Sequence, residues 1–375
     1  MMSSYFDFFC KNIENEDAQN TDRITGTCNS MCPEDEVKLR EDERLVHVLE
    51  VWGSERKLVK SYSRSAADSN MAIPHLLRPY SVLTNTVQYL LLDITRRVDV
   101  PASVVYDYVN DRLRAVRQDA TIQRLPPEQC VGLLEPMIRF YVYYGHKLSN
   151  LPLKDYDPVL NRKYLLECIK WYLSCCDTIS RTCGKIDHLT GFLSNLNLNG
   201  KDKKNKLVND KVLMENLYIL CNLDDLHPLL RYVNLSKEIK RQPKLQLAYD
   251  IAIANLHGNY VRVCRLSEKL CPLSYCALFT YLPTLQRRAL QVMSHAYSNK
   301  RLSVDSASVA QWLCFRTQRD AAAACALYGL AVEGANVRFD KTDFKADAAL
   351  NTPKPQEIRE KFDLSIMDIF TYTTP

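Results

Sequence analysis

The stretch RDAAAACALYGLAVEGANVRF, residues 319–339, carries the signals of a helix, a helix stop and a β-hairpin. A helix is expected over 319–328, and Gly329 suits the position just after a helix end. Two short alternating segments follow, 330–333 and 337–339, joined by a turn that contains Gly334. The stretch therefore predicts the last helix of a small unit and the hairpin that completes it.

Two more helices fit the sequence just before this stretch, at 285–298 and 304–315, after the pattern changes at Pro283. Three short helices followed by a hairpin make a winged helix. We therefore predict a winged helix over residues 284–345.

Upstream of the winged helix the chain predicts a stack of helices. Pro101 opens a helix in which an apolar stripe recurs at helical spacing, formed by Val104, Val105, Tyr108, Val109, Leu113 and Val116. The facing stripe is charged and holds Asp107, Asp111, Arg114 and Arg117. Further helices are expected at 33–51, 82–96, 127–149, 159–182, 185–197, 209–222, 225–240, 244–257 and 259–271. Short connections between them indicate helical hairpins stacked as a solenoid, although no strict sequence repeat is visible.

This pattern divides the chain into five expected segments. They are a flexible acidic tail at 1–22, an N-terminal helical region at 23–150, a helical-hairpin array at 151–283, the winged helix at 284–345 and a flexible C-terminal tail at 346–375. The C-terminal tail carries one apolar patch that we expect to dock on a partner, formed by Phe362, Leu364, Ile366, Met367, Ile369 and Phe370. The fold class is therefore mainly α, with a small β-hairpin near the end.

The composition is that of an ordinary globular protein, with 46% hydrophobic and 25% charged residues among 375. The net charge of +5 permits contact with nucleic acid or an acidic partner but does not argue for either. The first twenty residues lack the apolar run of a secretory signal, so the fourteen cysteines are expected in a reducing intracellular compartment. No apolar run approaches the roughly 20 residues of a membrane span, so no membrane contact is expected.

Two cysteines, Cys28 and Cys32, stand close together but have no second pair at zinc-finger spacing. One interpretation is a metal or redox site, for which only His47 offers a nearby further ligand. The other, which we favour, is a loop held by packing of Met31 and the two thiols, with Thr27 and Asn29 hydrogen-bonded locally. No metal is therefore expected.

The same loop begins a set of motifs that resembles the Sac-three/GANP family. Its opening motif corresponds to Gly26, Thr27, Cys28, Met31, Cys32, Pro33 and Glu34. A second motif corresponds to Arg78 and Pro79, and a third to Tyr106, Asp107, Asp111, Arg112, Arg114, Arg117 and Asp119. The resemblance covers about residues 24–340, with departures at Asn110, Ala120 and Arg162-Lys163 that suggest a diverged branch. Without long flanking regions, the chain looks like the short class of this family.

The resemblance implies a PCI-type module, in which helical hairpins are capped by a winged helix, and a scaffold role. Large family members organise mRNA export, and they pair with a second PCI protein and a small acidic subunit. The short class is linked to centrosome duplication and spindle organisation. The chain length favours a scaffold in centrosome duplication, spindle organisation and mitotic progression, located in the cytoplasm, centrosome or spindle. The alternative is a nuclear mRNA-export adaptor that binds RNA and a second PCI protein.

Catalytic motifs are absent from the sequence. It contains no GxGxxG, Walker loop, GxSxG or HExxH, and its seven histidines have no Asp or Cys partner at motif spacing. We therefore expect no enzyme activity and no cofactor, and an unrecognised enzyme remains only a third hypothesis.

Two basic stretches are candidates for contact with nucleic acid or a partner. In the third motif, Arg114 and Arg117 share a helix face, and internal ion pairs with Asp107, Asp111 or Asp119 are the competing interpretation. The alanine-rich third helix of the winged helix lacks side chains that read bases, which favours protein packing there. Residues 285–345 still hold nine Lys/Arg and five Asp/Glu, which leaves room for sequence-independent phosphate contact. The candidates are Arg287, Arg288, Lys300, Arg301, Arg316, Arg319 and Arg338.

Overall fold

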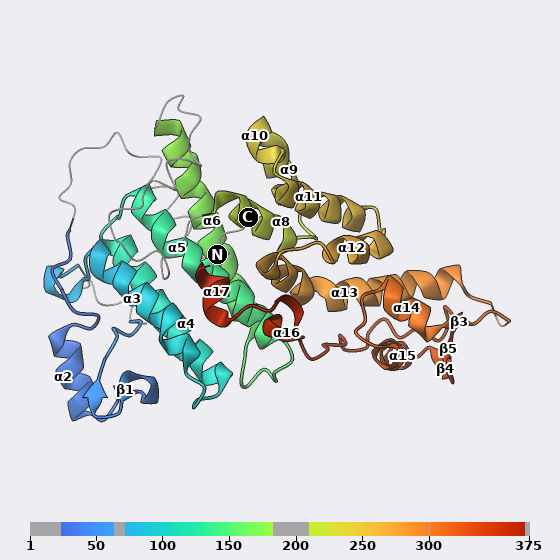
Figure 1. Cartoon of the computed structure of the whole chain (residues 1–375), viewed down its shortest axis with the longest axis horizontal. Coiled ribbons are helices and arrows are strands. Elements are labelled where there is room, and N and C mark those ends of the chain that lie inside the picture. The colour runs from blue at the N-terminus through green and yellow to red at the C-terminus, as the bar shows by residue number, and fades with distance from the viewer. Residues whose placement is uncertain (1–23, 64–71, 183–209, 300, 372–375) are drawn as a thin grey trace.

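The structure is a computed structural model that describes residues 24–63, 72–182, 210–299 and 301–371. It is mainly helical with two small antiparallel sheets, so the predicted fold class is confirmed (Figure 1). Some predicted features lie outside the described residues: the tail at 1–22, the helix at 185–197 and Lys300. Across the described ranges, no helix is both long and apolar enough to cross a membrane.

The N-terminal region begins with a helix that is shorter than predicted. Helix α2, Glu34–Asp42, ends where Arg44 adopts a left-handed backbone with φ of 56°. The Leu45 amide then donates to the Arg40 carbonyl at 2.7 Å, so a Schellman-type turn closes the helix. The predicted helix at 33–51 was therefore wrong beyond residue 43.

The remaining elements of this region bring the motif segments together. They are η1 (Val48–Glu50), β1 (Val51–Trp52), β2 (Glu55–Arg56), η2 (Pro74–Leu76), α3 (Tyr80–Leu92), η3 (Ile94–Arg96) and α4 (Ala102–Ile122). The α4 stripe is buried as predicted at Val105, Tyr108, Val109, Leu113 and Val116, while Val104 is partly buried.

Helices α5 (Pro127–Lys147) and α6 (Pro158–Thr182) form the centre of the molecule. They pack side by side, and the array continues through α8 (Lys211–Leu220), α9 (His227–Asn234), α10 (Lys237–Lys240), α11 (Pro243–Leu256) and α12 (Tyr260–Ser267) (Figure 1). The single helix predicted at 225–240 is two helices, because Ser236 takes an extended backbone and caps α10 with its hydroxyl.

Helix α13, Pro272–Ala296, runs without interruption through the predicted break at Pro283. The helix predicted at 285–298 therefore starts thirteen residues earlier than the sequence indicated, since 285 − 272 = 13. Two hydrophobic clusters meet along α13: Leu285 belongs to the larger cluster, and Ala289 and Leu290 belong to the smaller one. The helix is thus shared between the array and the unit that follows.

That unit has the connectivity of a winged helix. Its elements after α13 are β3 (Val304–Asp305), α14 (Ser306–Trp312), α15 (Gln318–Leu327), β4 (Ala331–Glu333) and β5 (Asn336–Arg338). The sheet order is β3-β5-β4, so a short strand joins the predicted hairpin. Gly329 ends α15 with φ of 86°, as expected, and a Cβ there would lie 2.3 Å from the Asp343 carbonyl oxygen.

The C-terminal segment differs from the predicted flexible tail. It forms α16 (Ile358–Phe362) and α17 (Ile366–Thr371). Ile369 and Phe370 are buried in the larger cluster, and α17 contacts α3 and α5. In Figure 1 the red segment returns from the winged helix to the middle of the molecule. The apolar patch therefore docks on this chain itself.

Candidate functional site

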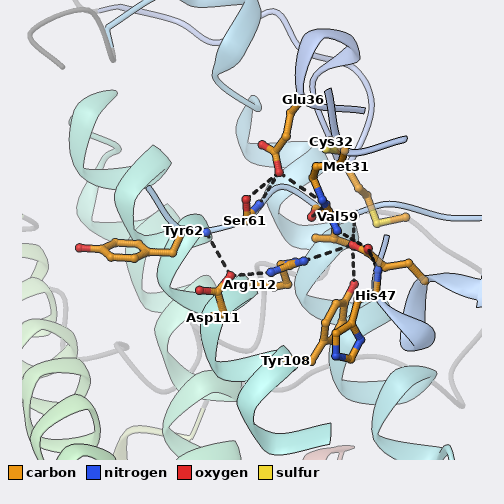
Figure 2. Close-up of polar contacts among 12 residues, drawn as sticks. Met31, Cys32, Glu36, His47, Val59, Ser61, Tyr62, Tyr108, Asp111 and Arg112 are labelled. Carbon is orange, nitrogen blue, oxygen red and sulfur yellow. Dashed lines mark hydrogen bonds and ion pairs between the residues drawn. The ribbon is translucent and has the colours of Figure 1, made fainter. Parts of the chain in front are cut away.

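The motif residues meet in a buried polar network whose centre is Glu50, a residue that the motifs did not include. The Glu50 Oε1 atom accepts hydrogen bonds from Tyr108 Oη at 3.1 Å and from Arg112 Nη2 at 3.3 Å. Its Oε2 atom accepts from Arg40 Nη2. Figure 2 shows Tyr108 and Arg112 of α4 turned toward His47 and Val59 of the preceding segments.

Two backbone amides complete the shell of Glu50. The amide of His47 donates at 3.0 Å and the amide of Val59 at 3.1 Å. Burial alone would raise the pKa of Glu50, but these amides and the charges of Arg112 and Arg40 bring it below its ordinary value. Glu50 is therefore a buried, ionised and fully hydrogen-bonded carboxylate.

Arg112 links Glu50 to a second carboxylate. Its Nη1 atom donates to Asp111 Oδ2 at 2.5 Å, and the same oxygen accepts from the Tyr62 amide at 3.1 Å. The guanidinium also lies over the Tyr108 ring, 4.6 Å from its centroid. Two motif residues thus hold the segment around Tyr62 against α4 (Figure 2).

Asp119 forms the second node of the network at the far end of α4. It accepts from Arg78 Nε at 2.7 Å and from Lys60 Nζ at 2.7 Å, and all three side chains are largely or fully buried. The Met31 carbonyl accepts from Arg78 Nη1 at 3.2 Å and from the Lys60 amide at 3.0 Å. The second and third motifs therefore meet the opening motif through a buried ion-paired cluster.

The backbone of the opening motif is held by distant segments of the chain. The Thr27 amide donates to the Pro74 carbonyl at 2.8 Å, and the Cys28 amide to the Leu77 carbonyl at 3.0 Å. The expected local bonding of Thr27 therefore gives way to pairing with the segment around η2. Gly26 is required by close approach, because a Cβ there would lie 2.3 Å from the Leu77 carbonyl oxygen.

The two thiols of the loop are buried, and burial raises the pKa of Cys32 to about 12. The Cys28 thiol donates to the Ser30 carbonyl at 3.3 Å. Within the described ranges, no group of three or more His, Cys, Asp or Glu side chains is placed to hold a metal ion. The geometry supports the packing interpretation of this loop.

Internal contacts also account for Arg114 and Arg117, although their partners differ from those considered. Arg117 pairs with Glu167 of α6 at 3.3 Å, and Arg114 stacks on the rings of Tyr62 and Tyr164. The ion pairs suggested with Asp107, Asp111 and Asp119 do not form for these arginines. Asp111 and Asp119 pair elsewhere, and Asp107 is exposed.

The network can position chain segments but offers little chemistry. Each carboxylate at its two nodes is matched by guanidinium, ammonium or backbone N–H groups. Removing one partner of a buried pair leaves an uncompensated charge and costs about 3–5 kcal/mol. The motif therefore acts as a clasp that fixes the N-terminal region on α4.

The basic candidates of the winged-helix unit lie on several elements and some are already paired. Arg288 of α13 pairs with Asp224 at 2.6 Å, and Arg338 of β5 with Glu333 at 3.3 Å. Arg316 lies 3.9 Å from Glu360, with both side chains well exposed. Of the others, Arg287 is half-buried, whereas Arg301 and Arg319 are exposed.

The exposed face of α15 is apolar and small. Ala323, Ala326 and Leu327 are exposed on it, whereas Ala321, Ala324 and Cys325 are buried beneath. Side chains that read base edges are missing from this face after Arg319. The arrangement suits contact with another protein surface.

A second apolar face lies on α9 and was missed in the sequence. Leu226, Leu230 and Val233 are 56%, 64% and 58% exposed, at a spacing that places them on one side of the helix. The opposite side is fixed by Arg231, which pairs with Asp177 and Glu215 at 2.8 Å each. The helical spacing of the three apolar residues was the signal that could have found it.

Comparison with known proteins matches the part of the chain that contains most of the motif residues and most of the winged-helix unit. The family model described as the SAC3/GANP family matches residues 31–334. Similar proteins include Protein xmas of Drosophila melanogaster, 28% identical over 331 residues, which cover 83% of this chain and 15% of the relative. SAC3 family protein B of Arabidopsis thaliana is 27% identical over 299 residues, which cover 73% of this chain and 16% of the relative.

A third relative is SAC3 family protein 1 of Schizosaccharomyces pombe. It is 23% identical over 363 residues, which cover 92% of this chain and 34% of the relative. The chain therefore spans between 15% and 34% of the length of these three relatives.

Proposed function

The chain belongs to the SAC3/GANP family, as its motifs predicted, and from this we propose that it is a non-enzymatic PCI-type scaffold. Its partners on this proposal are proteins, namely a second PCI protein and a small acidic subunit. The observation that carries the proposal is the way the family motifs are used. They form a buried clasp that holds helices in place and leaves outward-facing apolar surfaces.

We assign the second PCI protein to the exposed face of α15. Small side chains allow a partner backbone to approach closely, and Leu327, which is exposed, offers an apolar anchor. This assignment agrees with the lack of base-reading side chains on the same face.

The proposed setting is centrosome duplication, spindle organisation and mitotic progression, with the protein in the cytoplasm, at the centrosome or on the spindle. The alternative is nuclear mRNA export, with RNA and a second PCI protein as partners. One observation favours the alternative. The chain aligns with a minor part of much longer relatives, and the resemblance links the large family members to export.

The scaffold proposal is tested by capturing the tagged full chain from dividing cells. We expect a PCI-domain protein to be recovered with it. The double substitution Ala326→Gln/Leu327→Gln keeps good helix formers on α15 and should abolish that recovery. Val159→Asp, at an exposed position on α6, is the matched control and should leave recovery unchanged. If the natural chain, the α15 double variant and the control recover the same amount of the PCI-domain protein, α15 is not the docking face.

The two settings are separated by localisation and by RNA binding. If the fluorescently tagged chain lies at centrosomes and the spindle through mitosis, the centrosome and spindle setting is supported. A steady signal in the nucleus supports the mRNA-export setting. RNA binding that weakens steeply with salt supports the export role. Arg316→Glu/Arg319→Glu is the variant to test, because both side chains are exposed, whereas Arg288 is committed to Asp224. No RNA binding at low salt ends the export alternative.

A further inference from the structure

The C-terminal segment of the chain contains a short helix that has its own start signal. The Ser365 amide and hydroxyl donate to Asp368 Oδ2 at 2.8 and 2.6 Å, and the Asp368 amide donates back to Ser365 Oγ at 3.2 Å. This capping arrangement begins α17, which has six residues. A helix of that length is not stable in water by itself, so its helical form depends on what it packs against.

Helix α17 packs through its last apolar residues. Ile369 and Phe370 are buried against α3 and α5, and the Phe370 ring meets the Tyr143 ring edge to face with centroids 5.9 Å apart. The surface that receives them therefore belongs to α3 and α5.

A buried arginine completes this receiving surface. Arg139 Nη1 donates to the Ile369 carbonyl at 3.4 Å, which satisfies one of the unpaired carbonyls at the helix end. Arg139 is itself held by Glu135 Oε1 at 2.8 Å, and Glu135 Oε2 accepts from the Asp210 amide at 2.7 Å. The donor is thus positioned by α5 and its neighbours and does not depend on α17.

A second anchor of the C-terminal segment lies on α16, which packs against α13. The Phe362 ring of α16 meets the Tyr275 ring with centroids 5.7 Å apart, and Lys361 lies 4.1 Å above the same ring. Ile358 is also buried in the larger cluster. Between the two anchors the chain turns at Asp363, which has φ of 52°.

The C-terminal chain from Asn351 to Lys361 lines part of a cavity of about 860 Å³ between α13 and the winged-helix unit. Lys354, Gln356 and Lys361 line it from the segment, opposite Phe279 and Gln286 of α13. At its start the segment is tied to the winged-helix unit, since the Asn351 amide donates to Tyr328 Oη at 3.1 Å. The segment therefore spans the winged-helix unit, α13 and the α3–α5 surface.

The outer side of the segment is polar and weakly bound. Glu357, Glu360 and Asp368 are exposed, and the contact between Glu360 and Arg316 at 3.9 Å joins two well-exposed side chains, so it adds little. The segment also lies beyond the residues matched by the family model, which end at 334. Its attachment uses local apolar anchors, the Lys361 contact with Tyr275 and a hydrogen bond from Arg139.

We propose that the surface of α3, α5 and α13 is a binding groove for a short amphipathic helical segment, and that its ligand is this chain's own segment 357–371, bound in cis. Such a helix-in-groove contact uses apolar anchors on one face of the ligand and leaves the other face in water.

The test uses the full chain with Ile369→Asp/Phe370→Asp, which removes the ligand's buried anchors and leaves the groove intact. A fluorescent peptide of residues 355–371 with the natural sequence should bind this variant saturably, as measured by anisotropy. Its affinity for the unsubstituted chain should be lower by about a hundredfold or more, because the tethered segment competes for the groove at high effective concentration.

Two controls define the result. The peptide carrying the same two substitutions should not bind, and the full chain with Val98→Asp, at a position that is 97% exposed, should behave as the unsubstituted chain does. The proposal is overturned if natural and substituted peptides bind the groove variant equally, or if neither binds while circular dichroism shows native helix content.

A second measurement does not rely on the variant folding. A protease recognition sequence is inserted after Asp347, in an exposed stretch, and the otherwise natural chain is folded and then cut. The C-terminal fragment should stay with the body during gel filtration and exchange for excess labelled peptide. Immediate separation of the fragment contradicts the proposal. A dimer by light scattering before cutting contradicts binding in cis and indicates exchange of the segment between two copies.

Discussion

At the scale of single residues, Glu50 contributes most to the clasp although no motif includes it. It accepts from two arginines, one tyrosine and two backbone amides, and it is fully buried. The sequence could not identify it, because its partners lie up to 62 residues away and no spacing rule connects them. The motif residues Arg112 and Asp119 could be identified from the sequence, but their partners Glu50 and Lys60 could not.

Glu50→Gln should destabilise the fold by about 3 kcal/mol, because it removes the buried charge that Arg40 and Arg112 share and leaves them only Glu36 and Asp111, which are less buried. The free energy of unfolding is measured by urea titration. Glu41→Gln is the matched control: Glu41 pairs with Arg56 at 3.1 Å, but these side chains are 39% and 57% exposed. That control should change stability by less than about 0.5 kcal/mol. Equal effects of the two substitutions would contradict the clasp.

Because of His146, the folded protein should lose stability in acid. The His146 ring is buried against Phe279 and Tyr275, and its Nε2 atom has no hydrogen-bond partner among the described residues. Burial, and secondarily the charge of Lys361, lowers its pKa from 6.5 to about 4. The unfolded chain therefore binds a proton at a pH where the folded chain does not. Above pH 6.5 the ring is neutral in both states and has no effect, and stability then falls as the pH drops toward 4, by about 3 kcal/mol at most.

The measurement is the free energy of unfolding at several pH values for the natural chain and for His146→Leu. The variant should lose less stability between pH 6.5 and 4 than the natural chain does. His257→Leu, at an exposed position, should keep the natural slope. Identical slopes for the natural chain and His146→Leu would show that other groups control the acid response.

At the scale of elements, helix ends explain most differences between sequence and structure. Gly258 and Gly329 end α11 and α15 in the left-handed conformation, and both ends were predicted closely. Helices α2, α4 and α14 end in the same way, but with Arg44, Arg124 and Cys314 in the left-handed position. Without a glycine the α2 end carried no sequence signal, so the predicted helix ran on. Apolar periodicity, in contrast, was sufficient to predict α4, α5 and α6.

Arg44→Gly and Arg124→Gly should therefore each stabilise the protein by about 1 kcal/mol, because a left-handed backbone strains an L-residue but not glycine. Both side chains are exposed, so little contact is lost. Arg241→Gly is the control, because Arg241 ends α10 with φ of −74°. It should give no gain. The stability of the three variants is measured by thermal unfolding. If the glycine at residue 241 increases stability as much as those at 44 and 124, the left-handed conformation is not the cause.

At the scale of the whole molecule, α13 joins two cores of unequal size. Its first half packs in the larger cluster with α5 and α8, and its second half packs in the smaller cluster of the winged-helix unit. The sequence indicated a break at Pro283, because proline usually interrupts helices, but packing on both sides keeps this helix continuous. The returning C-terminal segment was also out of reach of sequence reasoning, since its anchors are tertiary contacts.

This arrangement predicts that the winged-helix unit opens more easily than the array. Phe339→Ala removes a buried ring from the smaller cluster and should speed amide hydrogen exchange in residues 304–338. Exchange in α5 should stay unchanged, because the first half of α13 remains anchored in the larger cluster. Leu113→Ala, a truncation in the larger cluster, should speed exchange in α5. Exchange that rises equally in α5 and in residues 304–338 for Phe339→Ala would show instead that α13 transmits unfolding through the whole molecule as one cooperative unit.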